Sequence, residues 1–158
     1  MKTDVEKFPV ASVPGARLLM VISPYYNGVA DMMQRGAEAA AEDAKATLDR
    51  VFVPGAFEIP AAIALAAKTE SWDGYLALGC VVRGETSHYD YVCGENARGL
   101  MDLTVREGLA IGYGILTVNT LAQAEERADP GRGDKGGESA RAALAMIALK
   151  RHFAELPR

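Results

Sequence analysis

Six consecutive residues, Arg83-Gly-Glu-Thr-Ser-His88, form the densest group of chemically active side chains in the sequence. Gly84 permits a ligand to approach the backbone closely, and a helix that begins here would present free N–H groups to an anion. The run is therefore a candidate phosphate site. Glu85 would contribute its backbone N–H, because its carboxylate would repel the phosphate. A plain helix cap formed by Thr86 or Ser87 is the alternative.

Three other places in the sequence could contact a small substrate. An imidazole exchanges protons near neutral pH, so His88 is a candidate general acid and base, although a structural role is equally compatible with one histidine. Glu58 could accept hydrogen bonds from substrate hydroxyls, or it could be an acidic residue favoured by a helix dipole. Tyr25 and Tyr26 could stack on a flat heterocycle or form an ordinary rim. His152 is expected at the surface.

The remaining motifs argue against a nucleotide-cofactor or metal site. Gly131-Arg-Gly-Asp-Lys-Gly136 matches G-x-G-x-x-G, but it follows a helical segment and Pro130 instead of a strand, so we reject a dinucleotide fingerprint. Histidine, cysteine and acidic residues lack metal-ligand spacing. Cys80 and Cys93 lie in apolar segments, and we expect buried thiols in a reducing compartment instead of a disulfide.

Charge and composition exclude two further classes of protein. A net charge of -4 lacks the basic excess that nucleic-acid binding requires, so nucleic acid is not an expected partner. The N-terminus has no apolar signal-peptide core, and no stretch approaches the roughly 18 apolar residues of a membrane span. The sequence therefore predicts a cytoplasmic protein with no membrane partner.

Apolar runs alternate with helical periodicities, and these elements must position the candidate side chains. Short apolar runs predict strands at 17–23, 48–53, 74–82 and 111–118. Helical spacing of apolar residues predicts helices at 27–46, 56–68, 87–107 and 139–154, with one more beginning after Thr120. A chain of 158 residues, 49% of them hydrophobic, is the usual size of one domain, so we expect a single domain over 1–158.

Capping patterns predict where several helices begin. Thr120 with Gln123 and Ser87 with Asp90 resemble capping boxes, the second with aspartate in place of glutamate. The proline and glycines of 130–137 are expected to interrupt the helix that begins after Thr120, before the last helix begins. That helix carries apolar residues on more than one side, which predicts that it is well covered.

This alternation predicts the fold and the region in which a ligand would bind. Strands and helices at this spacing form a parallel sheet with right-handed crossovers and helices on both faces, a three-layer αβα sandwich of the α/β class. Ligands bind beyond the carboxyl ends of such strands. The loops to search are therefore 23–27, 54–58, 82–88 and 119–123, and three of them contain candidate residues described above.

Four blocks of the sequence, in order, resemble the lumazine synthase family. They are Tyr26-Asn27, Pro54-Gly-Ala-Phe-Glu-Ile-Pro60, the stretch Gly79-Cys-Val-Val-Arg-Gly-Glu-Thr-Ser-His-Tyr-Asp-Tyr-Val-Cys93, and Glu126-Arg127 followed by Gly133-Asp-Lys-Gly136. The resemblance covers nearly the whole chain, and its second and third blocks are highly specific. It implies a four-stranded, flavodoxin-like sheet preceded by an N-terminal arm at 1–15.

The resemblance implies a transferase of riboflavin biosynthesis that needs no cofactor. Its substrates would be 5-amino-6-(D-ribitylamino)uracil and 3,4-dihydroxy-2-butanone 4-phosphate, and its products 6,7-dimethyl-8-ribityllumazine, phosphate and water. It implies ring stacking by Tyr26, a ribityl hydroxyl contact by Glu58, and proton transfer by His88. Backbone contacts to the pyrimidine and ribityl chain are implied for Ala56, Phe57, Cys80, Val81 and Val82.

Phosphate binding is implied for Glu85, Thr86 and Arg127, with Glu85 acting through its main chain. Tyr113 would come from a neighbouring subunit, and Asn27 and Lys135 complete the implied substrate-binding residues. Tyr26 stands where the family often has phenylalanine, a change that should preserve stacking. The 131–133 region matches the family poorly, and no role is assigned to it.

The resemblance also implies a homo-oligomer built on pentamers, with sites between subunits and riboflavin synthase as a further partner. A flavodoxin or a signalling receiver would share the alternation of elements. The loop Ser23-Pro-Tyr-Tyr26, however, lacks the hydroxyl-rich or acidic residues that these would need. The alternative function is a non-catalytic paralogue that binds flavin or lumazine. The presence of His88, Arg127 and Glu58 argues against it.

Overall fold

Ten short elements follow one another along residues 7–158, the part of the chain that the computed structural model describes. They are β1 (Arg17–Ile22), α1 (Asn27–Asp43), β2 (Thr47–Phe52), η1 (Ala56–Glu58), α2 (Ile59–Ala67), β3 (Gly74–Val82), α3 (His88–Glu107), β4 (Ala110–Val118), α4 (Leu121–Ala128) and α5 (Lys135–Ala154). Residues 1–6 of the expected N-terminal arm lie outside the described residues, and 7–14 form neither helix nor strand.

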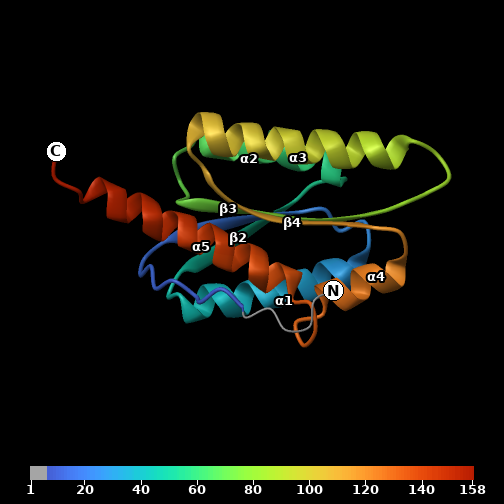
Figure 1. Ribbon diagram of the computed structural model, residues 1–158, viewed down its shortest axis with the longest axis horizontal. Helices are drawn as coiled ribbons and strands as arrows, with labels where there is room; N and C mark the ends of the chain where they lie inside the picture. The colour runs from blue at the N-terminus through green and yellow to red at the C-terminus, as the bar shows by residue number, and fades with distance from the viewer. Residues whose placement is uncertain (1–6) are drawn as a thin grey trace.

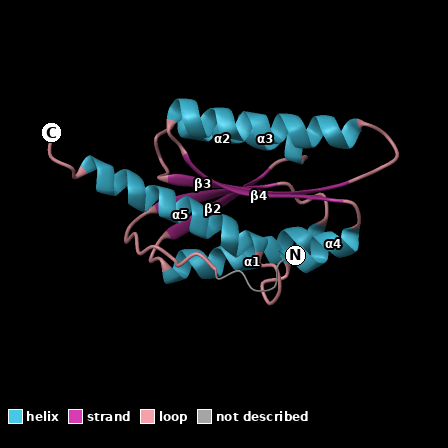
Figure 2. Cartoon of the chain, viewed as in Figure 1, coloured by secondary structure: helices cyan, strands magenta, loops and turns pink. Residues whose placement is uncertain are grey.

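The four strands form one parallel sheet in the order β2-β1-β3-β4. Helices α2 and α3 cover one face, and α1, α4 and α5 cover the other (Figure 1). Figure 2 shows the same three layers, with the strands enclosed between helices. The expected three-layer αβα sandwich with a four-stranded, flavodoxin-like sheet is therefore confirmed.

The two central strands are buried on both faces because helices cover both sides of them. Five of the six residues of β1 are buried, and so are the first seven of β3. This is why both strands read as nearly continuous apolar runs instead of alternating patterns. The edge strands β2 and β4 are more exposed.

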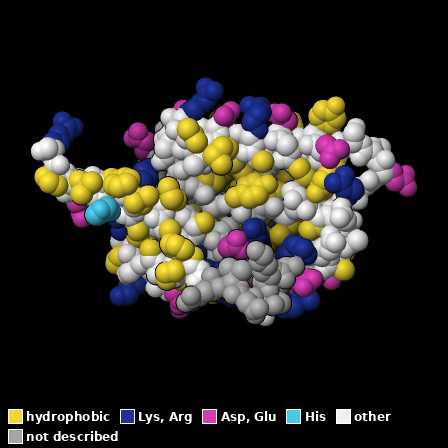
Figure 3. Space-filling model, viewed as in Figure 1, with side chains coloured by type: hydrophobic (Ala, Val, Ile, Leu, Met, Phe, Trp, Pro, Cys, Tyr) yellow, Lys and Arg dark blue, Asp and Glu magenta, His cyan; other side chains and the backbone are white. Residues whose placement is uncertain are grey.

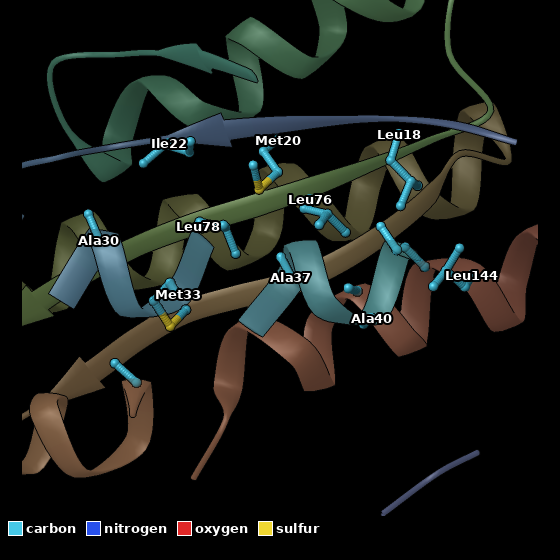
Figure 4. Packing of buried hydrophobic residues seen from close by; sticks show 14 of the residues in the cluster. Leu18, Met20, Ile22, Ala30, Met33, Ala37, Ala40, Leu76, Leu78 and Leu144 are labelled. Atoms are coloured by element: carbon cyan, nitrogen blue, oxygen red, sulfur yellow. The ribbon is translucent and has the colours of Figure 1, made fainter. Parts of the chain in front are cut away.

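Two apolar cores lie on the two faces of the sheet. On one face Leu18, Met20 and Leu76 pack against α1 and against Leu144 of α5 (Figure 4). The small side chains of α1 that face this core, such as Ala37, allow the helix to approach the strands closely. The second core joins the opposite side chains of the strands to buried residues of α2 and α3, among them Ile59, Ile63 and Leu100. These cores fix the positions at which the strands end, and therefore the loops that follow them.

Helix α5 begins at Lys135, so the expected start at 139 is wrong. Gly136 and Gly137 lie inside its first turn instead of interrupting the helical structure. A Cβ atom on Gly136 would overlap the carbonyl oxygen of Met33 in α1. Gly136 allows two helices to pack closely, a role that a local pattern cannot separate from helix breaking.

One expected helix cap is confirmed and the other is wrong. The Thr120 hydroxyl accepts a hydrogen bond from the Gln123 N–H at 3.2 Å, as expected. Ser87 forms no such cap, and its backbone is already helical. Its expected partner Asp90 instead faces Arg83, with a nitrogen–oxygen distance of 3.7 Å, because the preceding loop brings that guanidinium nearby.

Two expectations about burial are only partly met. Cys80 is buried, but Cys93 is only half-buried. The last helix is well covered as far as Ile147, beyond which it projects past the sheet (Figure 1). Apolar side chains lie along this projecting end (Figure 3), and the exposed ones within the helix are Leu149 and Phe153. None of the helices in the described part of the chain combines the length and the apolar character that crossing a membrane requires.

Candidate functional site

A cavity of about 530 Å³ opens at the carboxyl ends of β1, β2 and β3. The loop after β1, the η1 turn after β2, the end of β3 and the first turn of α3 all contribute to its wall. This is the edge at which ligands bind in parallel α/β sheets. The structure brings together here eight of the expected site residues, namely Tyr26, Ala56, Phe57, Glu58, Cys80, Val81, Val82 and His88.

Tyr26, at the start of α1, lines this cavity with an aromatic ring. Its ring packs edge-on against that of Tyr25, with centroids 5.0 Å apart and an interplanar angle of 70°. Burial, followed by the nearby Cys80 thiol and Tyr25, raises the pKa of Tyr26 above its ordinary value. The phenol therefore stays neutral near neutral pH, and it can stack on a flat ring or donate a hydrogen bond.

The η1 turn places Glu58 at the cavity wall. Its carboxylate lies beside Gly55, with one oxygen 3.6 Å from the position that a Cβ on that glycine would occupy. No hydrogen bond joins this carboxylate to any other residue in 7–158, so both oxygens can accept from a ligand. Carboxylate oxygens are suitable acceptors for the hydroxyls of a sugar-like chain.

His88 is the first residue of α3, and it is exposed at the edge of the cavity. The Thr86 hydroxyl accepts from its backbone N–H at 3.4 Å, which holds the start of the helix. The imidazole remains open to solvent and to the cavity. This position suits proton exchange with a bound ligand.

The loop before α3 is exposed and carries a fixed guanidinium group. Arg83 lies over the Tyr89 ring, 4.2 Å from its centroid, and donates to the Asn119 side chain at 3.0 Å. Glu85, Thr86 and Asn27 are expected site residues that line neither this cavity nor the one described next. Thr86 instead contributes the helix-start hydrogen bond to His88.

A second cavity of about 320 Å³ lies against the free edge of β4, between that strand and the ends of α4 and α5. It contains the remaining expected residues Tyr113, Arg127 and Lys135. The Arg127 guanidinium donates to the Gln123 carbonyl at 3.1 Å, and Lys135 pairs with Glu138 at 3.2 Å. No carboxylate within residues 7–158 lies at ion-pair distance from Arg127. Its charge is therefore available to an anion.

Tyr113 projects from an edge strand that no further strand covers. Its side chain is 39% exposed, and burial of the rest, with Cys93 and Tyr89 nearby, raises its pKa. Figure 3 shows hydrophobic atoms gathered across the middle of this face. An exposed aromatic beside a cationic cavity is a suitable contact for a second chain.

Cys80 lines the first cavity as a neutral thiol. Burial, with a smaller contribution from Cys93, raises its pKa to about 11. A thiol with so high a pKa is a poor nucleophile at neutral pH. Cys80 therefore contributes shape and backbone groups to the cavity.

Several wall residues were not expected from the sequence. They are Ser23, Gly55, Tyr91 and Val92. Tyr25, which the sequence analysis considered for stacking together with Tyr26, lines the first cavity as well. Tyr91 and Val92 could have been found from helical spacing, because they lie three and four residues after His88 on the same side of α3. Within the described residues, no group of three or more histidine, cysteine or acidic side chains could hold a metal ion.

Comparisons with known proteins identify the family to which this chain is similar. The family model for 6,7-dimethyl-8-ribityllumazine synthase matches residues 8–151. The protein of that name from Novosphingobium aromaticivorans is 52% identical over 138 residues, which cover 87% of this chain and 99% of the relative. Its counterpart in Azorhizobium caulinodans is 51% identical over 144 residues, 88% of this chain and 89% of the relative.

A third relative extends the match almost from end to end. The 6,7-dimethyl-8-ribityllumazine synthase 1 of Rhodopseudomonas palustris is 50% identical over 160 aligned positions, covering 96% of this chain and 98% of the relative. The matched region includes both cavities and every expected site residue. This chain belongs to the 6,7-dimethyl-8-ribityllumazine synthase family.

Proposed function

We propose that this chain is the transferase that forms 6,7-dimethyl-8-ribityllumazine in riboflavin biosynthesis. Its substrates are 5-amino-6-(D-ribitylamino)uracil and 3,4-dihydroxy-2-butanone 4-phosphate. The observation that carries this proposal is about 50% identity to proteins of that name over nearly the full length of both chains. It works as a single domain in the cytoplasm, without a cofactor.

The first cavity takes the pyrimidine and its ribityl chain. Tyr26 stacks on the ring, and Glu58 accepts hydrogen bonds from ribityl hydroxyls. Main-chain groups of the η1 turn and of the end of β3 contact the polar edges of the ring. Support comes from the cavity itself, which combines an aromatic side, a free carboxylate and backbone groups in about 530 Å³.

The phosphate of the second substrate binds where two subunits meet. Arg127 and Lys135 offer two cations in the second cavity of one subunit, and Tyr113 lies beside them. The neighbouring subunit contributes the rest of this site, which comprises the main chain of Glu85 and Thr86 together with Asn27. Because the expected residues divide between two cavities of one chain, a complete site needs two chains. The homo-oligomer is built on pentamers, and riboflavin synthase is a further partner.

The reaction is a condensation in which protons move at each step. The aromatic amine of the pyrimidine attacks the ketone carbon, and loss of water gives an imine. Proton removal from the carbon chain then expels inorganic phosphate and leaves an enol that tautomerises to a second carbonyl. The ribitylamino nitrogen attacks that carbonyl, and the ring closes with loss of a second water. His88 accepts and returns protons in these steps. Holding both substrates together can supply about 7–11 kcal/mol of the acceleration.

An absorbance assay with the purified protein tests this function. The two substrates should be consumed in equal amounts, with the lumazine chromophore appearing and one inorganic phosphate released for each product molecule. Either substrate alone should give no product, and the two substrates without the protein should give product only at the slower uncatalysed rate. A protein that binds the lumazine but does not accelerate its formation would contradict the proposal.

A further inference from the structure

Asn96 is a fully buried amide in the middle of an apolar stripe. It lies on α3 between Val92 and Leu100, which are the other buried residues of that helix, and its exposed fraction is 0%. A buried amide at such a position lowers stability unless its polar atoms are bonded. Its Nδ2 donates to the Ala56 carbonyl at 2.5 Å, but its Oδ1 is buried with no partner within residues 7–158. The stability of the fold therefore does not explain why an asparagine occupies this position.

The Ala56 carbonyl does not need the hydrogen bond from Asn96 as a partner. The Ala56 oxygen already accepts the backbone N–H of Ile59, at the end of the η1 turn. Reversing the amide would place Oδ1 against the Ala56 oxygen, two acceptors in contact, so the donor orientation is fixed. Asn96 is a second donor to an oxygen that the turn satisfies by itself. Its effect is to hold the peptide unit in one orientation.

We infer that Asn96 is a positioning residue that fixes the Ala56–Phe57 peptide at the first cavity for contact with the pyrimidine substrate, an inference that rests on the proposed function. This peptide is trans, so its N–H points opposite to its C=O, away from α3. The N–H of Glu58 bonds to the Gly55 carbonyl at 3.2 Å, whereas that of Phe57 has no backbone partner in the described chain. A free donor held at the cavity wall suits a ring carbonyl of the pyrimidine.

The test compares Asn96→Leu and Asn96→Ala with the wild-type protein. Both substitutions remove the hydrogen bond, and leucine also fills the space. We expect the KM for the pyrimidine to rise roughly three- to tenfold, the effect of one hydrogen bond, with the KM for the butanone phosphate unchanged. The Tm of Asn96→Leu should stay the same or rise, because the buried unpaired Oδ1 is gone.

Gln34→Leu is a matched control. Gln34 is also a buried amide, it donates to the Ala30 carbonyl at 3.3 Å, and it lies on α1 at the opposite face of the sheet. Its substitution should lower the Tm and leave both KM values unchanged, as expected of a purely structural amide.

Each result of this experiment has one meaning. An active wild-type protein with an unchanged KM for the pyrimidine in both Asn96 variants would overturn the inference. So would the unfolding of both variants, because it would show that Asn96 serves stability. A wild-type protein without turnover would instead overturn the proposed function, and the inference with it.

Discussion

Two side chains of the first cavity differ in their exposure to solvent. The His88 imidazole is exposed at the start of α3, where solvent and a ligand can both reach it. The Cys80 thiol is buried, and burial raises its pKa to about 11. The buried thiol stays protonated at neutral pH, so Cys80 is not a candidate for the acid–base role that we propose for His88.

Replacing His88 with alanine should keep the fold and slow turnover by at most roughly 10²–10⁴-fold, the contribution of one acid–base group. The fold should persist because the side chain is exposed. The remaining rate comes from holding the two substrates together. Turnover measured by lumazine absorbance between pH 6 and 8 checks this. His152→Ala, at the exposed end of α5, is the control and should match the wild type. If His88→Ala turned over as fast as the wild type, His88 would have no part in the mechanism.

Alkylation of Cys80 should be slow at pH 8 and should accelerate as the pH rises toward 11. With a pKa of about 11, roughly one thiol in a thousand is ionised at pH 8. Because the folded pKa lies above the ordinary value of 9.0, the proton contributes stability that is complete below about pH 9 and is lost as the pH rises to about 11.

Mass spectrometry of the peptide that contains Cys80 measures this reactivity, and the free energy of unfolding should fall over the same pH range. Urea-unfolded protein is the control, and its thiol should react readily at pH 8. Equal alkylation rates of native and unfolded protein at pH 8 would show that the thiol is not buried.

Among the elements, α1 and α5 are in close contact where Gly136 has no side chain. Gly136→Ala should destabilise the protein by about 1–3 kcal/mol, because its Cβ would overlap the Met33 carbonyl. Gly94→Ala in α3 is the control: no atom lies within 4 Å of its Cβ position, and alanine favours a helix by about 0.5–1 kcal/mol. Urea unfolding measures both. Equal stability of the two variants would mean that α1 and α5 do not pack this closely.

The strands could be predicted from the sequence because their signal is local. Both ends of β3 were expected where they occur, at Gly74 and Val82, because full burial on both faces makes its apolar run continuous. The start of α5 could not be predicted, because the effect of Gly136 depends on a helix about one hundred residues earlier in the chain. Ser87 failed as a cap because its backbone is already helical, and the Asp90 N–H bonds to the Ser87 carbonyl at 3.0 Å instead of to its hydroxyl.

The candidate site could be predicted in part, because it depends on where the predicted strands end. Parallel strands end at one edge, so the loops that contain Tyr26, Glu58 and His88 were expected to meet there, and they line one cavity. The resemblance to a family supplied Tyr113 and Arg127. Helical spacing alone does not reveal Asn96, because its partner Ala56 lies forty residues away.

At the scale of the whole molecule, the proposed site is divided between two cavities of the chain. The first cavity offers an aromatic ring, a carboxylate and an imidazole, and the second offers two cations beside an exposed tyrosine. Apolar side chains are exposed near β4 and along the projecting end of α5 (Figure 3). An oligomer that brings the first cavity of one subunit against the second cavity of the next would complete the site and cover apolar surface.

Mixing two inactive variants tests this arrangement. Arg127→Ala damages the second cavity alone, and the double variant Glu58→Ala/His88→Ala damages the first alone. In a ring of identical head-to-tail interfaces, random mixing in equal amounts leaves about one interface in four with both partners intact. The mixed oligomer should therefore recover a measurable fraction of wild-type activity, whereas each variant assembled alone shows little at low substrate concentration.

The control is an oligomer reassembled from two separately tagged samples of Arg127→Ala, which should remain as inactive as its parents. Mass spectrometry of the intact assemblies verifies that subunits have exchanged in both mixtures. Recovery requires that Arg127 and His88 act from different subunits, since a site within one chain would be damaged in every copy. If the exchanged mixture shows only the average of the two parental activities, each site lies within a single subunit and the shared-site proposal is wrong.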